Sequence, residues 1–126
     1  MPKNILVIDD EGLVTKSLRK LLTKEGYNAV IASGASEAME KLKAFSFDLI
    51  ISDIRMPEID GIETIQRLRQ LQKDAGRQPI PEIIITGHAD QEKYKEALKL
   101  GVSDYIFKPF DTQQFLEAIK GKLNVA

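Results

Sequence analysis

Three aspartates, a threonine and a lysine are the residues of this chain whose types and spacing could do chemistry. Each follows a short apolar run: Asp9 and Asp10 after the first, Asp53 after the third, Thr86 after the fourth and Lys108 after the fifth. Clustered carboxylates repel one another and take up protons unless a cation lies among them. Oxygen ligands without His or Cys favour a hard ion such as Mg²⁺. The three aspartates therefore indicate a magnesium site, if the fold brings them together.

The threonine and the lysine suit an anionic oxygen. Lys108 supplies a point charge of the kind that binds phosphate, and the Thr86 hydroxyl can donate a hydrogen bond to the same oxygen. A carboxylate nucleophile, a metal ion, a lysine and a hydroxyl together are the parts that phosphoryl transfer needs. Taken singly, each residue has a simpler structural interpretation: Asp9 can cap a helix, and Lys108 can be a solvated loop charge. Their joint placement after the apolar runs favours the chemical interpretation.

The elements that must position these side chains follow from the hydrophobic pattern. Continuous apolar runs are typical of strands that are covered on both faces. Five of them recur along the chain: Ile5 to Ile8, Ala29 to Ala32, Leu49 to Ile51, Ile83 to Ile85 and Tyr105 to Phe107. Segments with helical spacing separate them. This alternation predicts an α/β fold with a doubly wound, five-stranded parallel sheet. Ligands of such sheets bind outside the carboxyl ends of the strands, where the polar residues fall.

Local signals mark several element boundaries. Asp60-x-x-Glu63 and Asp111-x-x-Gln114 resemble capping boxes and predict helix starts. Gly26 and Gly101 are expected to end the first and fourth helices. The segment from residue 73 to 81, which contains two prolines, is interpreted as a surface connection.

Length and composition restrict the class of protein. With 126 residues, the chain is expected to form one domain, residues 1–126. A net charge of -1 gives no electrostatic reason for nucleic-acid or membrane binding. The absence of cysteine excludes disulfides and thiolate sites. No apolar run approaches the roughly 20 residues that span a bilayer. A cytoplasmic domain is therefore expected.

The chain resembles the receiver domain of response regulators in two-component signal transduction, over essentially its whole length. The matching features are Asp9-Asp10, Asp53 with Met56-Pro57 and Asp60-Gly61, Thr86, and Lys108-Pro109. The resemblance implies a flavodoxin-like (βα)5 fold with strand order 2-1-3-4-5. It also implies that the chain catalyses only its own phosphorylation and dephosphorylation, and is not otherwise an enzyme.

The resemblance implies a role for each site residue. Asp53 would accept a phosphoryl group from the phosphohistidine of a sensor histidine kinase or a histidine phosphotransfer protein. Asp10, Asp53 and the backbone carbonyl of Arg55 would bind Mg²⁺ directly, and Asp9 would act mainly through water. Lys108 would pair with Asp53 and then with the phosphoryl group. The product would be an aspartyl phosphate.

The resemblance also implies a conformational readout. Thr86 would move to hydrogen-bond the phosphoryl oxygen, and Tyr105 would rotate inward to fill the space that it leaves. The Lys108-Pro109 peptide is expected to be cis. The population would shift between two states that differ on the surface of the fourth helix, fifth strand and fifth helix.

Two further side chains are expected to tune the phosphoryl site. Arg55 lies two residues after the acceptor, and we expect it to cross the phosphoryl group and alter the access of hydrolytic water. His88 lies two residues after Thr86. Each also has a simpler interpretation, as a solvated loop cation and an exposed loop histidine. Beyond the kinase, the expected partner is a downstream effector or an output domain of the same chain, since the sequence fits either a single-domain regulator or a domain cut from a longer one. Homodimerisation through the last two strand–helix units stays open.

Other functions make different demands on the same residues. A haloacid-dehalogenase-like phosphotransferase needs a second acid two residues after its nucleophile, where this chain has Arg55. A flavodoxin-type FMN site needs a loop rich in glycine and hydroxyl groups after the first strand, whereas Asp9-Asp10-Glu11 would repel the phosphate. A receiver that works through protein contacts without phosphorylation stays open.

Overall fold

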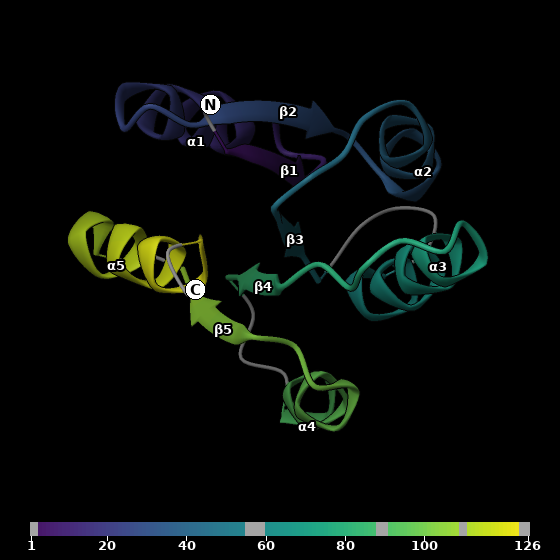
Figure 1. Ribbon diagram of the computed structural model, residues 1–126. Helices are drawn as coiled ribbons and strands as arrows, with labels where there is room; N and C mark the ends of the chain where they lie inside the picture. The colour runs from purple at the N-terminus through teal and green to yellow at the C-terminus, as the bar shows by residue number, and fades with distance from the viewer. Residues whose placement is uncertain (1–2, 55–59, 88–90, 109–110, 124–126) are drawn as a thin grey trace.

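The computed structural model describes residues 3–54, 60–87, 91–108 and 111–123, and five strands alternate with five helices along these segments (Figure 1). The strands are β1 (Asn4–Ile8), β2 (Asn28–Ala32), β3 (Leu49–Asp53), β4 (Glu82–Thr86) and β5 (Asp104–Phe107). The helices are α1 (Gly12–Lys24), α2 (Ala35–Ala44), α3 (Gly61–Asp74), α4 (Gln91–Leu100) and α5 (Thr112–Leu123). The α/β class predicted from the sequence is confirmed.

The strands form one parallel sheet in the order β2-β1-β3-β4-β5. The order expected from the resemblance, 2-1-3-4-5, is therefore confirmed. β1 pairs with β2 on one side and with β3 on the other, and this is where the order of the strands reverses. Crevices outside the carboxyl ends of strands at such a point are where ligands bind in doubly wound folds.

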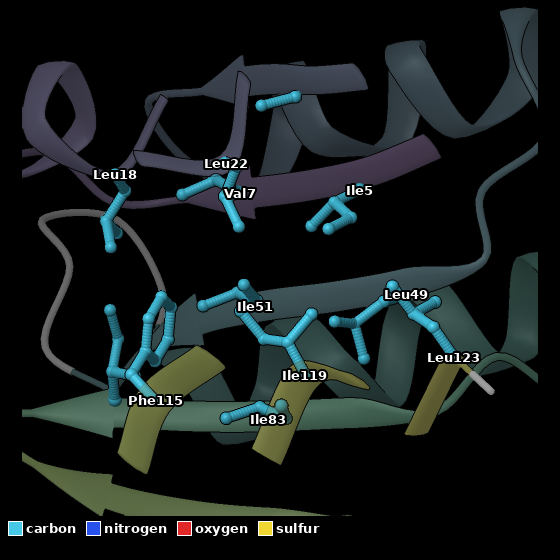
Figure 2. Packing of buried hydrophobic residues seen from close by; sticks show 12 residues of the cluster. Ile5, Val7, Leu18, Leu22, Leu49, Ile51, Ile83, Phe115, Ile119 and Leu123 are labelled. Atoms are coloured by element: carbon cyan, nitrogen blue, oxygen red, sulfur yellow. The ribbon is translucent and has the colours of Figure 1, made fainter. Parts of the chain in front are cut away.

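Helices cover both faces of the sheet, with α1 and α5 on one side and α2, α3 and α4 on the other (Figure 1). Successive strand residues point to opposite faces, so one strand contributes to two cores. Val7 of β1 belongs to the core cluster that also contains Leu22 of α1 and Ile119 of α5 (Figure 2). Leu6, the preceding residue, belongs to a second cluster with Leu42 of α2. Burial on both faces explains why the strands are continuous apolar runs and not alternating ones.

Helix termini form largely where the local signals predict them. The Asp60 carboxylate accepts a hydrogen bond from the Glu63 backbone N–H at 2.9 Å and caps α3. Asp111 accepts one from the Gln113 N–H at 2.7 Å, directly before α5. Gly26 and Gly101 adopt positive φ angles of 88° and 77° after α1 and α4, where glycine carries no steric cost.

The segment from residue 73 to 81 begins inside α3, which continues to Asp74. Beyond the helix, two side chains fasten the connection: Arg77 Nη1 donates to the Leu42 carbonyl at 2.6 Å, and Gln72 Nε2 donates to the Gln78 carbonyl at 3.1 Å. The predicted surface connection is therefore shorter than expected and is tied to α2.

Among the residues that the structure describes, no helix is long and apolar enough to span a membrane.

Candidate functional site

Three carboxylates meet at the carboxyl ends of β1 and β3. Asp9 directly follows β1, and its backbone N–H continues the sheet by donating to the Ala32 carbonyl at 3.1 Å. Asp53 is the last residue of β3, and Ile8 lies opposite Ser52 in the register. Ligand oxygens of Asp9, Asp10 and Asp53 lie within 4.8 Å of one another. The register of two parallel strands thus brings together acids that are 44 positions apart in the sequence (53 − 9).

Lys108 joins this cluster from the end of β5. Its Nζ lies 3.2 Å from Asp9 Oδ2 and 3.3 Å from Asp53 Oδ2. The Lys108 backbone N–H donates to the Thr86 carbonyl at 2.7 Å, which fixes the residue beside β4. Asp9 and Asp53 are almost fully buried, at 2% and 4% exposure, whereas Asp10 is exposed. One ammonium therefore lies against two buried carboxylates.

The charges of the cluster are not balanced by Lys108 alone. Burial raises the pKa of Asp9 above its ordinary value, and this outweighs the stabilising hydrogen bond from the Glu11 N–H and the attraction of Lys108; the Asp53 charge raises it further. Burial works against the Lys108 ammonium as well, but attraction to Asp53 and Asp9 outweighs burial and raises the pKa of Lys108. A second cation at this point would relieve the cost of holding Asp9 ionised.

The donor set fits a hard divalent ion. Three carboxylates at one strand edge, two of them buried, offer only oxygen ligands, and such ligands suit Mg²⁺. The exposed Asp10 leaves one side of the site open to solvent, which suits an ion that keeps several of its waters. Arg55, whose carbonyl is the fourth expected ligand, lies outside the described residues.

Thr86 ends β4 and its side chain is fully buried. In the register, Ile85 lies opposite Asp53, so Thr86 follows one position later on the neighbouring strand. Thr86 is therefore at the same edge of the sheet as the carboxylate cluster, as predicted. His88 and Pro109, the other predicted residues of these loops, lie outside the described residues, as do Met56 and Pro57.

Tyr105 belongs to an aromatic cluster that joins β5 to α4. Its ring centroid lies 4.9 Å from that of Tyr94, nearly perpendicular to it, and 5.2 Å from that of Phe107. Tyr105 also packs against the buried core between the sheet, α3 and α4. The contact of Tyr94 with Tyr105 was not predicted from the sequence. The role of Phe107 was missed, although it directly precedes Lys108.

Gly61 contacts the end of β3 in a way that the sequence did not reveal. A Cβ at this position would lie 2.1 Å from the Asp53 carbonyl oxygen and 2.8 Å from the Ile54 Cα. The Gly61 N–H donates to the Ile54 carbonyl at 2.7 Å. Only glycine allows the first residue of α3 to approach the end of β3 this closely. The Asp60-Gly61 pair therefore fastens α3 to the backbone that carries Asp53.

Lys93 of α4 forms an ion pair with Asp60, and sequence reasoning missed this contact as well. A lysine on an amphipathic helix carries no signal of its partner.

A separate cavity of about 520 Å³, lined among others by Ile50, Arg69 and Gln72, lies near the amino ends of β4 and β5. It contains none of the clustered carboxylates, so the chemistry is assigned to the carboxyl edge of the sheet and not to this cavity.

Similarity to known proteins extends over most of the chain. The family model "Response regulator receiver domain" matches residues 5–120. Transcriptional regulatory protein FixJ of Bradyrhizobium diazoefficiens is 35% identical over 123 residues, which are 98% of this chain and 58% of FixJ. Chemotaxis protein CheY of Treponema pallidum is 38% identical over 125 residues, which are 97% of this chain and 83% of CheY. The chain thus spans little more than half of FixJ, and only 23% of the similar regulator ZraR of Escherichia coli.

Solved structures share the fold. A CheY-like receiver domain protein of Methanospirillum hungatei superposes with a TM-score of 0.88 at 32% identity, over 98% of this chain and 95% of the other. The crystal structure of FixJ-N matches with a TM-score of 0.82 at 32% identity, over 100% of this chain and 98% of the other. The sequence and the fold match the same family, and the fold carries acids after β1 and β3, a threonine at the end of β4 and a lysine after β5. The chain belongs to the response regulator receiver domains of two-component systems.

Proposed function

We propose that this receiver domain is a phosphoacceptor, in which Asp53 takes a phosphoryl group from the phosphohistidine of a sensor histidine kinase or a histidine phosphotransfer protein. One observation carries the proposal: the Asp53 carboxylate lies 3.3 Å from the Lys108 ammonium and within 4.8 Å of two further carboxylates. A nucleophile between a cation and a set of metal ligands can attack an anion that it would otherwise repel.

The transfer exchanges one bond for another. An Asp53 carboxylate oxygen attacks the phosphorus, an O–P bond forms, and the N–P bond to the histidine breaks with its electron pair left on the imidazole. Bound Mg²⁺ would neutralise charge that develops on the phosphoryl oxygens. Asp10 and Asp53 would hold the ion directly and Asp9 mainly through water, with the Arg55 carbonyl as a further ligand.

The remaining site residues act on the product. Lys108 exchanges part of its pairing with Asp53 for the more strongly charged phosphoryl group. Thr86, buried at the end of β4, donates its hydroxyl to a phosphoryl oxygen. Tyr105 then turns inward into the space beside it. The Lys108-Pro109 peptide is proposed to be cis.

The readout is a changed surface on α4, β5 and α5. Tyr94, Leu98 and Phe107 expose 38%, 56% and 47% of their surfaces on α4 and β5, and neighbouring exposed apolar side chains suit an interaction surface. A movement of Tyr105, which contacts both Tyr94 and Phe107, alters this surface directly. We propose that a downstream effector, or an output domain of the same chain, recognises it. Homodimerisation would use the same two strand–helix units.

Residues 1–126 act as one receiver unit in the cytoplasm, and this unit makes no direct contact with nucleic acid. The chain acts as an enzyme only on itself.

Arg55 and His88 tune the lifetime of the phosphoryl group, Arg55 by altering the access of water. Replacing Arg55 with alanine and measuring the phosphoryl half-life tests this role, which an unchanged half-life would rule out.

The central test is phosphorylation by a small donor. Wild-type protein with acetyl phosphate and Mg²⁺ is expected to take up about one phosphoryl group per chain, measured by phosphate-affinity electrophoresis or intact mass. Asp53→Asn removes the nucleophile and keeps the size of the side chain, so it is expected to take up none. Chelation of Mg²⁺ should abolish uptake by the wild type.

Two results would contradict the proposal. Equal uptake by Asp53→Asn would assign the modification to another residue. No uptake by folded wild-type protein at saturating donor and Mg²⁺ would favour a receiver that works through protein contacts alone.

A further inference from the structure

An ion pair joins the first turn of α4 to the N-terminus of α3. Lys93, the third residue of α4, donates from its Nζ to Asp60 Oδ2, and to Glu96 Oε2 at 3.3 Å. Asp60 is also the N-cap of α3, through its other carboxylate oxygen. Both members of the pair are about two thirds buried, with exposures of 31% and 32%. The pair thus joins the first turn of α4 to the N-terminus of α3.

Asp60 is in turn fixed to the backbone of Asp53. It precedes Gly61, whose backbone packs against the Asp53 carbonyl and donates to the Ile54 carbonyl at 2.7 Å. No side chain fits between these two segments. A displacement of Asp60 would therefore be transmitted to the end of β3 through these backbone contacts.

A second route joins the same turn of α4 to the same site. Tyr94, next to Lys93, packs its ring 4.9 Å from Tyr105 and 6.3 Å from Phe107. Phe107 is followed by Lys108, whose Nζ lies 3.3 Å from Asp53. The first turn of α4 is therefore held to the acceptor site from two sides, by charge through Asp60 and by aromatic packing through β5.

We propose that Lys93 is a positioning residue for phosphoryl transfer, whose ion pair with Asp60 holds the first turn of α4, and Tyr94 over Tyr105, in the arrangement of the unphosphorylated chain. This inference rests on the proposed function of Asp53. The pair stabilises the arrangement in which it forms and thereby disfavours the phosphorylated one.

The direction follows from what phosphorylation requires. Thr86 must move toward the phosphoryl group, and it is joined to Lys93 by the short segment 87–92. α4 can follow this movement only if the contacts of its first turn change with it. Tyr105 turns inward in the proposed switch and so changes its contact with Tyr94, whereas Asp60 stays held by the Gly61 backbone contacts. The partly exposed Lys93–Asp60 pair is therefore the contact that must weaken. A contact that is stronger in the unphosphorylated state opposes any modification that favours the phosphorylated state.

The experiment compares phosphorylation rates of matched variants. Lys93→Met removes the charge and keeps an apolar chain of similar length, whereas Lys93→Arg keeps the charge. Asp60→Asn removes the charge of the partner and retains a residue that caps helices well. Lys95→Met is the control, because Lys95 is an exposed lysine of the same helix. Rate constants are measured with acetyl phosphate and Mg²⁺, after circular dichroism has shown that each variant is folded.

Lys93→Met and Asp60→Asn are each expected to raise the rate constant about two- to fivefold, the range of a partly exposed ion pair. The double variant should be no faster than either single one, because both remove the same interaction. Lys93→Arg and Lys95→Met should keep the wild-type rate. At about 1 M NaCl the ratio of Lys93→Met to wild type should fall toward one, since salt screens the pair.

A second measurement reports on position and not on rate. Lys93→Met should shift the ring proton resonances of Tyr94 and Tyr105 in the unphosphorylated protein, whereas Lys93→Arg should not. Equal rates for Lys93→Met and Lys95→Met, or a Lys93→Arg variant as fast as Lys93→Met, would overturn the inference. Each of these results presupposes a wild type that takes up phosphate at Asp53, so failure of the inference is distinct from failure of the proposed function.

Discussion

The contact between Gly61 and Asp53 shows how one missing side chain can set the geometry of a site. A Cβ at position 61 would lie 2.1 Å from the Asp53 carbonyl oxygen, a separation that real side chains do not adopt. The obstacle is backbone on both sides, so no rotation of a side chain can relieve it. Any larger residue must push α3 away from β3 or displace the end of β3, which carries Asp53.

Replacing Gly61 with alanine should therefore destabilise the fold, by about 2 kcal/mol or more, as overpacking of a rigid site does. Gly121→Ala is the matched control, since a Cβ at Gly121 in α5 would meet no neighbouring atom within 4 Å and alanine favours helix. Unfolding in urea, followed by circular dichroism, gives both free energies of unfolding. A Gly61→Ala variant within about 0.5 kcal/mol of wild type, the usual range for neutral surface substitutions, would show that the segments separate without cost.

At the scale of elements, α3 and α4 meet through charge. Burial on its own would raise the pKa of Asp60, but hydrogen bonds from the Glu63 N–H and from Lys93 outweigh it and hold the pKa below its ordinary value. The hydrogen bond to Asp60 raises the pKa of Lys93 and outweighs the small effect of burial. Both partners therefore favour the charged pair at neutral pH.

The sign of the pH dependence follows from the lowered pKa of Asp60. Its stabilising contribution is fully present above the unfolded value, 3.8, and is lost as the pH falls through the lower folded value. At pH 7 we expect wild type to exceed Asp60→Asn by about 0.2 to 1 kcal/mol in free energy of unfolding, and the difference should shrink as the pH falls below about 4. Urea unfolding of both proteins from pH 7 to pH 3 measures it. A difference that grows on acidification would contradict the assignment.

The whole molecule was predictable from its sequence to the extent that burial dictates residue type. Strands covered on both faces must be apolar throughout, so Ile83 to Ile85 could be read as a strand, and the polar residue that ends it, Thr86, had to fall at the sheet edge. Contacts between helices were not predictable. The Lys93–Asp60 pair depends on which of many surface charges meet, and the Gly61 approach depends on a backbone separation that no residue type encodes.

Mg²⁺ bound at the proposed site of the three carboxylates should stabilise the whole domain. A ligand that binds only the folded chain adds RT ln(1 + [L]/Kd), or about 2.7 kcal/mol at a hundredfold excess over Kd. Free energies of unfolding at increasing MgCl₂, with NaCl adjusted to constant ionic strength, are therefore expected to rise for the wild type. Asp10→Asn should lose most of this gain, whereas Asp74→Asn, at the other end of α3 from Asp60, should keep it. The gain should also decrease in acid, because Mg²⁺ must compete with the proton that the raised pKa of Asp9 favours. An equal rise in Asp10→Asn would mean that Mg²⁺ stabilises the domain elsewhere.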